Sequence, residues 1–454
     1  MKKINDKDKI LGDAVKIINQ WLNYQVFIKR IPGASFGVVQ GSKIQYVNHF
    51  GYSDLNSKKK PNDKTQYRIA SISKLFTTTA ILQLVQDGKI SLDDKIQKYL
   101  SWFKSKTDKN LNEITIRHLL MHCSGLNREA DSDYWTSDKF PNINEIKKTI
   151  ENNPTAYKIL EKWKYSNLGF AILGQVIKEI SGVSYEEYIK RNILNKLNLK
   201  DTYVDFKKEI EKNLAIGYGR RLPNLERERF KHIETHDFAS ATGFSSNVND
   251  LCTFLSSQLD SNEILLKEPY KKEMRRVQWI KDENLNWGLG YIIKKINGKT
   301  IYWHSGGFPG FMTAVGICSE HNFGVVVLTN AIDSPAESLI DGIFKILLHL
   351  LENYEKYKSI KNLVNYEKYL GRYRCRWEDI DIQRINNSLI LYNPSSLDIF
   401  GQVDILEHKK DNTFIIKEGD GFGCVGENIH FHLNNKGKVE SLRVGAARYY
   451  PINI

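Results

Sequence analysis

The sequence predicts an α+β protein: an antiparallel sheet that lies between helices and carries a helical insert, followed by a small all-β unit. Three observations predict this class. Apolar residues at helical spacing frame the first 350 residues, tight hairpins lie just inside these helices, and short strands with Asn, Gly and Asp turns follow from about residue 363. We expect a large domain over residues 1–355 and a small β-domain over residues 363–454.

The chain opens with a predicted helix and hairpin. Apolar residues at helical spacing predict a helix over residues 12–29, which ends before Pro32. Residues 34–39 and 43–49 are expected to form two strands, joined by a tight turn at Gly41.

Helices are expected to dominate the middle of the chain. Residues 72–85 form an amphipathic pattern with one apolar side. The acidic residues in Leu92-Asp93-Asp94 predict the first turn of another helix. Residues 111–260 are predicted to be mostly helical and to supply the insert.

The second half of the predicted sheet follows this insert. Asn297-Gly298 supplies the two positive-φ residues of a type I′ turn, so residues 288–303 are expected to form a hairpin. Residues 312–318 and 324–329 predict a second antiparallel pair, and residues 335–351 a long helix.

Composition narrows the class of protein. Hydrophobic residues make up 41% of the 454 residues and charged residues 26%, which is typical of a soluble globular protein. The net charge of +13 is scattered along the chain, so we expect no nucleic-acid partner. No apolar run is long enough to span a bilayer and no signal peptide is evident, so we expect no membrane association and a cytoplasmic location. The five cysteines have no metal-ligand spacing, and we expect no metal or organic cofactor.

Ser71 and Lys74 form the first candidate motif. An extended stretch meets a helix at Ser71, which places the hydroxyl at a helix N-terminus. Lys74 lies one turn further on the same face, and a desolvated lysine can serve as a base for a serine nucleophile. The alternative is a simple helix cap beside a surface lysine.

Tyr165-Ser166-Asn167 is the second motif and precedes an apolar helix. The phenol of Tyr165 is expected to pass protons between Ser71 and a leaving group, with its pKa lowered by Lys74. Asn167 offers one acceptor and two donors, which suffice to hold Lys74 and a substrate carbonyl. The alternative is a packed tyrosine and an asparagine cap.

His304-Ser305-Gly306-Gly307 is the third motif and ends a predicted strand. Glycines at a strand edge permit close approach of a ligand, and the N–H of Gly307 with that of Ser71 would form an oxyanion hole. His304 is expected to orient substrate or assist proton movement. The alternative is a glycine-rich turn beside an ordinary histidine.

None of these motifs is specific alone. The Ser-x-x-Lys spacing also occurs at Ser57/Lys60 and Ser101/Lys104, where no comparable surroundings exist. The favoured motifs are nevertheless accompanied, over residues 12–350, by five stretches in a fixed order along the chain. These are Tyr67–Lys74, Asp87–Asp94, Ile116–Leu126, Gly243–Asp250 and Trp287–Tyr291.

With these motifs and stretches, the chain resembles the serine β-lactamase-like family, which includes class C β-lactamases, D-alanyl-D-alanine peptidases, D-aminopeptidases and esterases. The resemblance implies a β-lactamase/transpeptidase-like fold, Ser71 as the acylated nucleophile, Lys74 and Tyr165 as the general acid/base pair, and Asn167 as a substrate-positioning residue. The C-terminal part, from about Tyr369-Leu-Gly-Arg-Tyr373, resembles the lipocalin-like β-barrel that follows this domain in some relatives.

One departure from the family pattern bears on the substrate. β-Lactamases and cell-wall peptidases typically have Lys-Thr-Gly where this chain has His304-Ser305-Gly306, and that lysine helps to receive a substrate carboxylate. The departure weakens the case for a β-lactamase or a carboxypeptidase, and His-x-Gly is similar to the aminopeptidase, amidase and esterase branches of the family. Because a β-barrel is appended in some of those peptidases, we expect hydrolysis of an amide bond in a small molecule or short peptide. A carboxylesterase, a β-lactamase and a non-catalytic ligand sensor remain alternatives, and homo-oligomerisation remains open.

Overall fold

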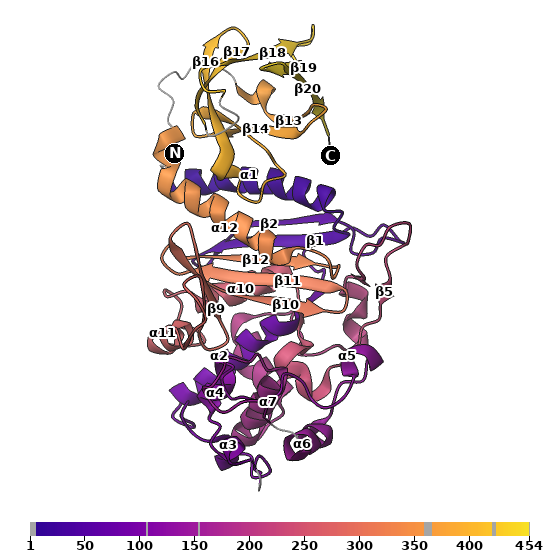
Figure 1. Cartoon of the computed structure of the whole chain (residues 1–454), viewed down its shortest axis with the longest axis vertical. Coiled ribbons are helices and arrows are strands. Elements are labelled where there is room, and N and C mark those ends of the chain that lie inside the picture. The colour runs from indigo at the N-terminus through magenta and orange to yellow at the C-terminus, as the bar shows by residue number, and fades with distance from the viewer. Residues whose placement is uncertain (1–5, 106–107, 153–154, 358–365, 420–423, 454) are drawn as a thin grey trace. The chain divides into compact units, whose positions relative to one another are not determined.

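The computed structural model describes residues 6–105, 108–152, 155–357, 366–419 and 424–453, and it divides into two compact units. One unit comprises residues 31–340, and the other comprises residues 1–30 together with residues 341–454 (Figure 1). The domain limits expected at residues 355 and 363 stay a prediction, since residues 358–365 lie outside the described ones.

An antiparallel sheet of eight strands organises the unit of residues 31–340. Its order is β2-β1-β12-β11-β10-β9-β8-β7, so β1 of the first hairpin pairs with β12, the last strand of this sheet along the chain. The three predicted hairpins are confirmed, and Asn297 and Gly298 both have positive φ. The strands are β1 (Gly33–Gln40), β2 (Lys43–Gly51), β7 (Trp279–Ile280), β8 (Leu285–Trp287), β9 (Ile292–Ile296), β10 (Lys299–Phe308), β11 (Phe311–Cys318) and β12 (Phe323–Thr329).

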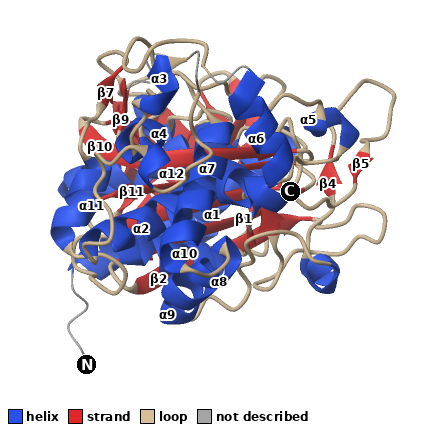
Figure 2. Ribbon diagram, turned by 90° about the horizontal axis from the view of Figure 1, so that it is seen from below, coloured by secondary structure: helices blue, strands red, loops and turns tan. Residues whose placement is uncertain are grey.

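Helix α10 (Val248–Gln258) packs closely on one face of this sheet, beside β1 and β12 (Figure 2). The close approach depends on Gly37 of β1. A Cβ atom there would lie 2.5 Å from Sγ of Cys252 and 2.7 Å from Cγ2 of Val248, so any larger residue would have to displace these side chains. The glycine thus lets helix and strand share one core.

The predicted helical insert is confirmed and forms the lower part of this unit in Figure 1. Two short ribbons, β3 (Tyr67–Arg68) with β6 (Ser245–Ser246) and β4 (Gly217–Tyr218) with β5 (Arg229–Phe230), were not predicted. The helices are α2 (Ser73–Gln86), α3 (Lys109–Asn112), α4 (Ile116–Leu120), α5 (Tyr134–Ser137), α6 (Ile143–Asn152), α7 (Asn167–Ser181), α8 (Tyr185–Ile189), α9 (Asn195–Leu197) and α11 (Glu268–Arg275).

The helix expected to begin at Leu92 is wrong. The carboxylate of Asp94 accepts a hydrogen bond from the backbone N–H of Ser91 at 2.8 Å and closes a turn. Asp93 binds Arg117 at 2.7 Å. Acidic side chains that are used in this way favour a turn over a helix start, and only a 3₁₀ turn at Ile96–Lys98 follows.

A closed barrel of eight strands dominates the second unit, which confirms the expected small β-barrel. The unit also contains α1 (Asp6–Ile28) and most of α12 (Ala336–Asn353), both predicted as helices. The barrel strands are β13 (Gly371–Arg374), β14 (Asp379–Ile385), β15 (Ser388–Tyr392), β16 (Val403–Lys410), β17 (Thr413–Gly419), β18 (Asn428–Leu433), β19 (Val439–Val444) and β20 (Ala447–Ile452).

Helix α1 is fixed to this unit by specific polar contacts. Buried Arg372 forms a two-pronged ion pair with Asp381 at 2.6 and 2.7 Å and also donates to the carbonyl oxygen of Gln20 at 2.8 Å. The indole N–H of buried Trp21 donates to the carbonyl oxygen of Ser396 at 2.8 Å. The segment before the sheet and the segment after it therefore form one compact unit. Among the helices of the described residues, none is long and apolar enough to cross a bilayer.

Candidate active site

Ser71 lies in a 3₁₀ turn, Ala70–Ile72, that leads directly into α2. Ala70 has a φ of 47°, an uncommon conformation for a residue with a Cβ, and such strain is often found at functional sites. The turn is tied down on both sides, because Ile69 donates to the carbonyl oxygen of Phe244 at 2.9 Å and Ser73 donates to that of Ala70 at 2.5 Å. Ser71 itself is half-buried.

Lys74 is completely buried and contacts three oxygen atoms: Oγ of Ser71 at 3.2 Å, Oδ1 of Asn167 at 2.7 Å and the carbonyl oxygen of Ala241 at 2.8 Å. Burial lowers the pKa of Lys74 well below its ordinary value of 10.5. A neutral amine has two N–H donors and one lone pair. In that neutral form the two oxygens that can only accept would take the two N–H groups, which leaves the lone pair for the hydroxyl proton of Ser71.

Asn167 begins α7, and its amide is held on both sides. Its Oδ1 accepts from Lys74, while its Nδ2 donates to the carboxylate of Glu129 at 2.7 Å. Glu129 also accepts from the hydroxyl of Tyr134. The sequence did not predict Glu129, which belongs to the insert and has no motif around it. Asn167 thus contacts Lys74 as expected, at 2.7 Å, and its proposed role toward substrate stays a prediction.

Tyr165 lies between cations and imidazoles. Nζ of Lys74 is 4.8 Å from its ring centroid, and the guanidinium of Arg128 is 5.3 Å away. Burial raises the pKa of Tyr165 above its ordinary value, although a hydrogen bond with Ser71 lowers it in part. The expected lowering by Lys74 is therefore wrong in direction. Burial outweighs the hydrogen bond with Ser71 and the charge of Arg128, so Tyr165 keeps its proton at neutral pH.

Strand β10 carries the third motif at an open part of the sheet. The pairing of β9 with β10 ends at Trp303, whereas the pairing with β11 continues to Phe308. Ser305 and Gly307 line a cavity beside Ser71. Gly306 is placed differently: a Cβ atom there would lie 2.1 Å from the carbonyl oxygen of Ile69. It holds the strand against the turn that carries Ser71 and does not face the cavity.

Two buried histidines flank Tyr165. His304 has Nδ1 2.6 Å from the carbonyl oxygen of Ser305, and burial lowers its pKa to about 3. His122, which was quoted only within a family-like stretch, has its ring centroid 4.3 Å from that of Tyr165. Its Nδ1 accepts from the N–H of Ser166 at 3.1 Å, and burial lowers its pKa well below 6.5. Both imidazoles are therefore neutral at pH 7.

These groups surround a cavity of about 340 Å³. Three indoles form much of its wall, and those of Trp163 and Trp287 stack at 4.0 Å. Among the described residues, no group of three or more His, Cys, Asp or Glu side chains is arranged to hold a metal ion. The lining residues are Ser71, Arg128, Trp135, Trp163, Tyr165, Asn167, Thr242, Trp287, Ile292, His304, Ser305 and Gly307.

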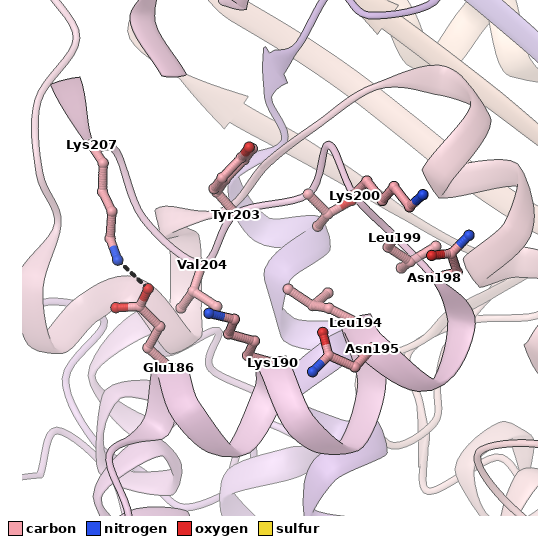
Figure 3. Close-up of a pocket in the computed structure, with 11 residues that line it drawn as sticks. Glu186, Lys190, Leu194, Asn195, Asn198, Leu199, Lys200, Tyr203, Val204 and Lys207 are labelled. Carbon is pink, nitrogen blue, oxygen red and sulfur yellow. Dashed lines mark hydrogen bonds and ion pairs between the residues drawn. The ribbon is translucent and has the colours of Figure 1, made fainter. Parts of the chain in front are cut away.

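A larger cavity, of about 540 Å³, lies between α8 and the segment after α9 (Figure 3). Exposed lysines surround an apolar floor there, and Lys207 pairs with Glu186. No residue of the three motifs lines it. The smaller cavity is the candidate active site, because it alone of the two contains a serine in contact with a buried amine.

The fold and the site together define a serine hydrolase of the β-lactamase type. The Beta-lactamase family model matches residues 18–348, and the chain belongs to this family. Protein flp of Staphylococcus aureus (strain N315) is 26% identical over 366 residues, which cover 79% of this chain and 71% of that protein. Penicillin-binding protein 4* of Bacillus subtilis (strain 168) is 27% identical over 365 residues, which cover 74% of this chain and 77% of that protein.

A solved structure resembles the chain over nearly its whole length. It is described as the octameric penicillin-binding protein homologue from Pyrococcus abyssi. The match covers 96% of this chain and 99% of that one, with a TM-score of 0.66 and 24% identity. This likeness, with the family match and the closed barrel, confirms the predicted fold class.

Proposed function

We propose that this protein hydrolyses an amide bond of a small molecule or short peptide through an acyl-enzyme on Ser71. One observation carries the proposal: Nζ of buried Lys74 lies 3.2 Å from Oγ of Ser71, while Asn167 and Ala241 accept hydrogen bonds from it at 2.7 and 2.8 Å. This is the arrangement that a general base needs in order to activate a serine.

The proposed reaction has two halves. Oγ of Ser71 attacks the carbonyl carbon while its proton passes to Lys74, and the backbone N–H groups of Ser71 and Gly307 receive the oxyanion. Tyr165 donates a proton to the leaving nitrogen, is reprotonated from Lys74, and the amine departs. Water then attacks the ester carbonyl, its proton returns through Tyr165 and Lys74 to Oγ of Ser71, and the carboxylic acid leaves.

Three alternatives give different results in simple assays. A carboxylesterase would cleave esters and leave amides intact. A β-lactamase would hydrolyse a chromogenic cephalosporin, which His304 in place of the family lysine disfavours. A ligand sensor with a relic site would bind without turnover, which the intact contacts of Lys74 disfavour.

The test is covalent labelling with a fluorophosphonate, followed by mass spectrometry. We expect an adduct on Ser71, none in Ser71→Ala, and no turnover by Ser71→Ala. Ser57→Ala is the matched control, because Ser57 repeats the Ser-x-x-Lys spacing but is exposed and donates to Asp54 at 2.9 Å. Turnover by Ser71→Ala at the wild-type rate would refute the proposal.

Homo-oligomerisation is a separate proposal, supported by the description of the Pyrococcus abyssi homologue as octameric. Size-exclusion chromatography with light scattering tests it, and a mass near the 52.5 kDa of one chain would refute it. The cytoplasmic location stays a prediction.

A further inference from the structure

The larger cavity, of about 540 Å³, has the size of a small-molecule site and a two-sided lining (Figure 3). Its floor is apolar, because Leu194, Leu199 and Val204 line it and are otherwise buried. The exposed side chains around this floor are polar or charged, namely Glu186, Lys190, Asn195, Asn198, Lys200 and Lys207. The cavity therefore offers apolar surface to one part of a ligand and polar groups to another.

The charges around this cavity do not balance. Three lysines and one glutamate line it. Glu186 pairs with Lys207, and in the described part of the chain no acidic side chain pairs with Lys190 or Lys200. Two ammonium groups are therefore available to a ligand, and each offers a positive charge and three N–H donors.

The walls of the cavity are held in place without a ligand. In the segment opposite the helix in Figure 3, the backbone of Tyr203 pairs with that of Ser245 at 2.9 and 3.0 Å. The hydroxyl of Thr202 donates to the carboxylate of Asp250 at 2.8 Å. On the helical side, Lys190–Leu194 forms a π-helix, a rare conformation that is frequently found at functional sites. A cavity that is formed in advance lowers the entropic cost of binding.

We propose that this cavity binds a small aliphatic anion, whose carboxylate or phosphate group is attracted by Lys190 and Lys200 and whose alkyl chain covers the apolar floor. The inference is independent of the proposed hydrolysis, because no residue of the three motifs lines the cavity. A cationic ligand is disfavoured, since the one carboxylate in the lining, that of Glu186, is already paired. An inorganic anion would leave the apolar floor exposed to water.

Isothermal titration calorimetry of the full chain at low salt tests this inference with ligands that share one alkyl chain: octanoate, octyl phosphate and octylamine. We expect the anions to bind and octylamine not to bind, and the anion with the lower Kd identifies the preferred head group. Butyrate should bind about 10- to 100-fold more weakly than octanoate, because its chain covers less of the apolar floor. Added salt should weaken the binding of both anions, since the lysines are exposed.

Substitutions locate the binding site. Lys190→Gln combined with Lys200→Gln removes both charges at exposed positions and should weaken binding about 3- to 30-fold. Lys196→Gln is the matched control, because Lys196 is also exposed on this stretch of chain but does not line the cavity. Arg128→Gln removes the guanidinium that lines the candidate active site, and it should leave the binding of both anions unchanged.

Several results would overturn the inference. Failure of both anions to bind at about 10 mM would exclude the site, and equally tight binding of octylamine would exclude its preference for anions. Equal weakening by Lys196→Gln would reduce the effect to the general charge of the protein. Loss of binding in Arg128→Gln, without loss in the double lysine variant, would place the ligand at the candidate active site. None of these results bears on the fluorophosphonate adduct of Ser71, so the proposed function is tested separately.

Discussion

Gly306→Ala should disturb the active site through steric contact alone. The added methyl group would lie 2.1 Å from the carbonyl oxygen of Ile69 and 2.6 Å from Oγ1 of Thr313, whereas ordinary contacts begin near 3.4 Å. The strand or the turn must therefore move by about 1 Å. Overpacking of this kind costs about 1–3 kcal/mol. A displacement of about 1 Å at a reacting group costs on the order of 100-fold in rate.

The matched control is Gly307→Ala, because its methyl group would meet only Sδ of Met312 at 3.5 Å, an ordinary contact. Thermal unfolding should show a decrease in Tm of about 2–6 °C for Gly306→Ala and almost none for Gly307→Ala. The rate of fluorophosphonate labelling of Ser71 reports the geometry of the nucleophile and should fall in Gly306→Ala. Gly307→Ala is the control for stability alone, because Gly307 lines the cavity beside Ser71. If Gly306→Ala kept both the wild-type Tm and the wild-type labelling rate, the close contact with Ile69 would be disproved.

Four further predictions follow from buried charged and titratable groups. Lys74→Met should lower kcat by about 10²- to 10⁴-fold with its fold retained, as measured by turnover and circular dichroism; a loss under tenfold would exclude it as the base. Burial keeps the pKa of Lys74 well below 10.5, so kcat/KM should reach its plateau well below pH 10.5, and a rise that continued to that pH would contradict a neutral lysine. The pKa of His304 is about 3 in the folded protein, against an ordinary 6.5, so the unfolded state binds the proton first as the pH falls. The free energy of unfolding should therefore decrease below pH 6.5 by about 1.4 kcal/mol per pH unit. Urea titrations of His304→Gln should lack this pH-dependent decrease. Arg372→Met leaves Asp381 buried without its partner and should lower the free energy of unfolding by about 3–5 kcal/mol. The control is Lys417→Met, which removes an exposed ion pair and should lower it by less than about 1 kcal/mol. Equal losses in urea unfolding would contradict the burial of the Arg372–Asp381 pair.

Local patterns predicted most of the fold. The Asn297-Gly298 turn needs only two positive-φ residues, so a short stretch suffices to predict it. Helix α2 forms where it was predicted, but the single apolar side expected for it is wrong, because every residue from Ser73 to Leu84 is buried. The prediction of a helix start at Leu92 failed because the carboxylate of Asp94 accepts a hydrogen bond from the backbone N–H of Ser91. Local charge alone does not distinguish a carboxylate that closes a turn from one that lies in the first turn of a helix.

The candidate site was predictable where its residues are close in sequence and not where contacts cross the chain. Ser71 and Lys74 are three residues apart, so helix geometry alone brings them together. Glu129 reaches Asn167 across 38 residues, and no motif surrounds it. The direction of the Tyr165 pKa depends on how deeply the ring is buried, which the sequence does not reveal.

The joint unit of α1 and the barrel sets the order in which the chain can fold during synthesis. The indole of Trp21 packs so tightly on α12 that a Cβ atom at Gly342 would be 2.2 Å away, yet roughly 310 residues separate that glycine from the end of α1. At about 5–20 residues per second, the ribosome needs roughly 15–60 s to make this stretch. Helix α1 therefore emerges long before its partners, and its apolar side stays uncovered in the meantime. The sheet and its insert, by contrast, can complete their core before the barrel exists.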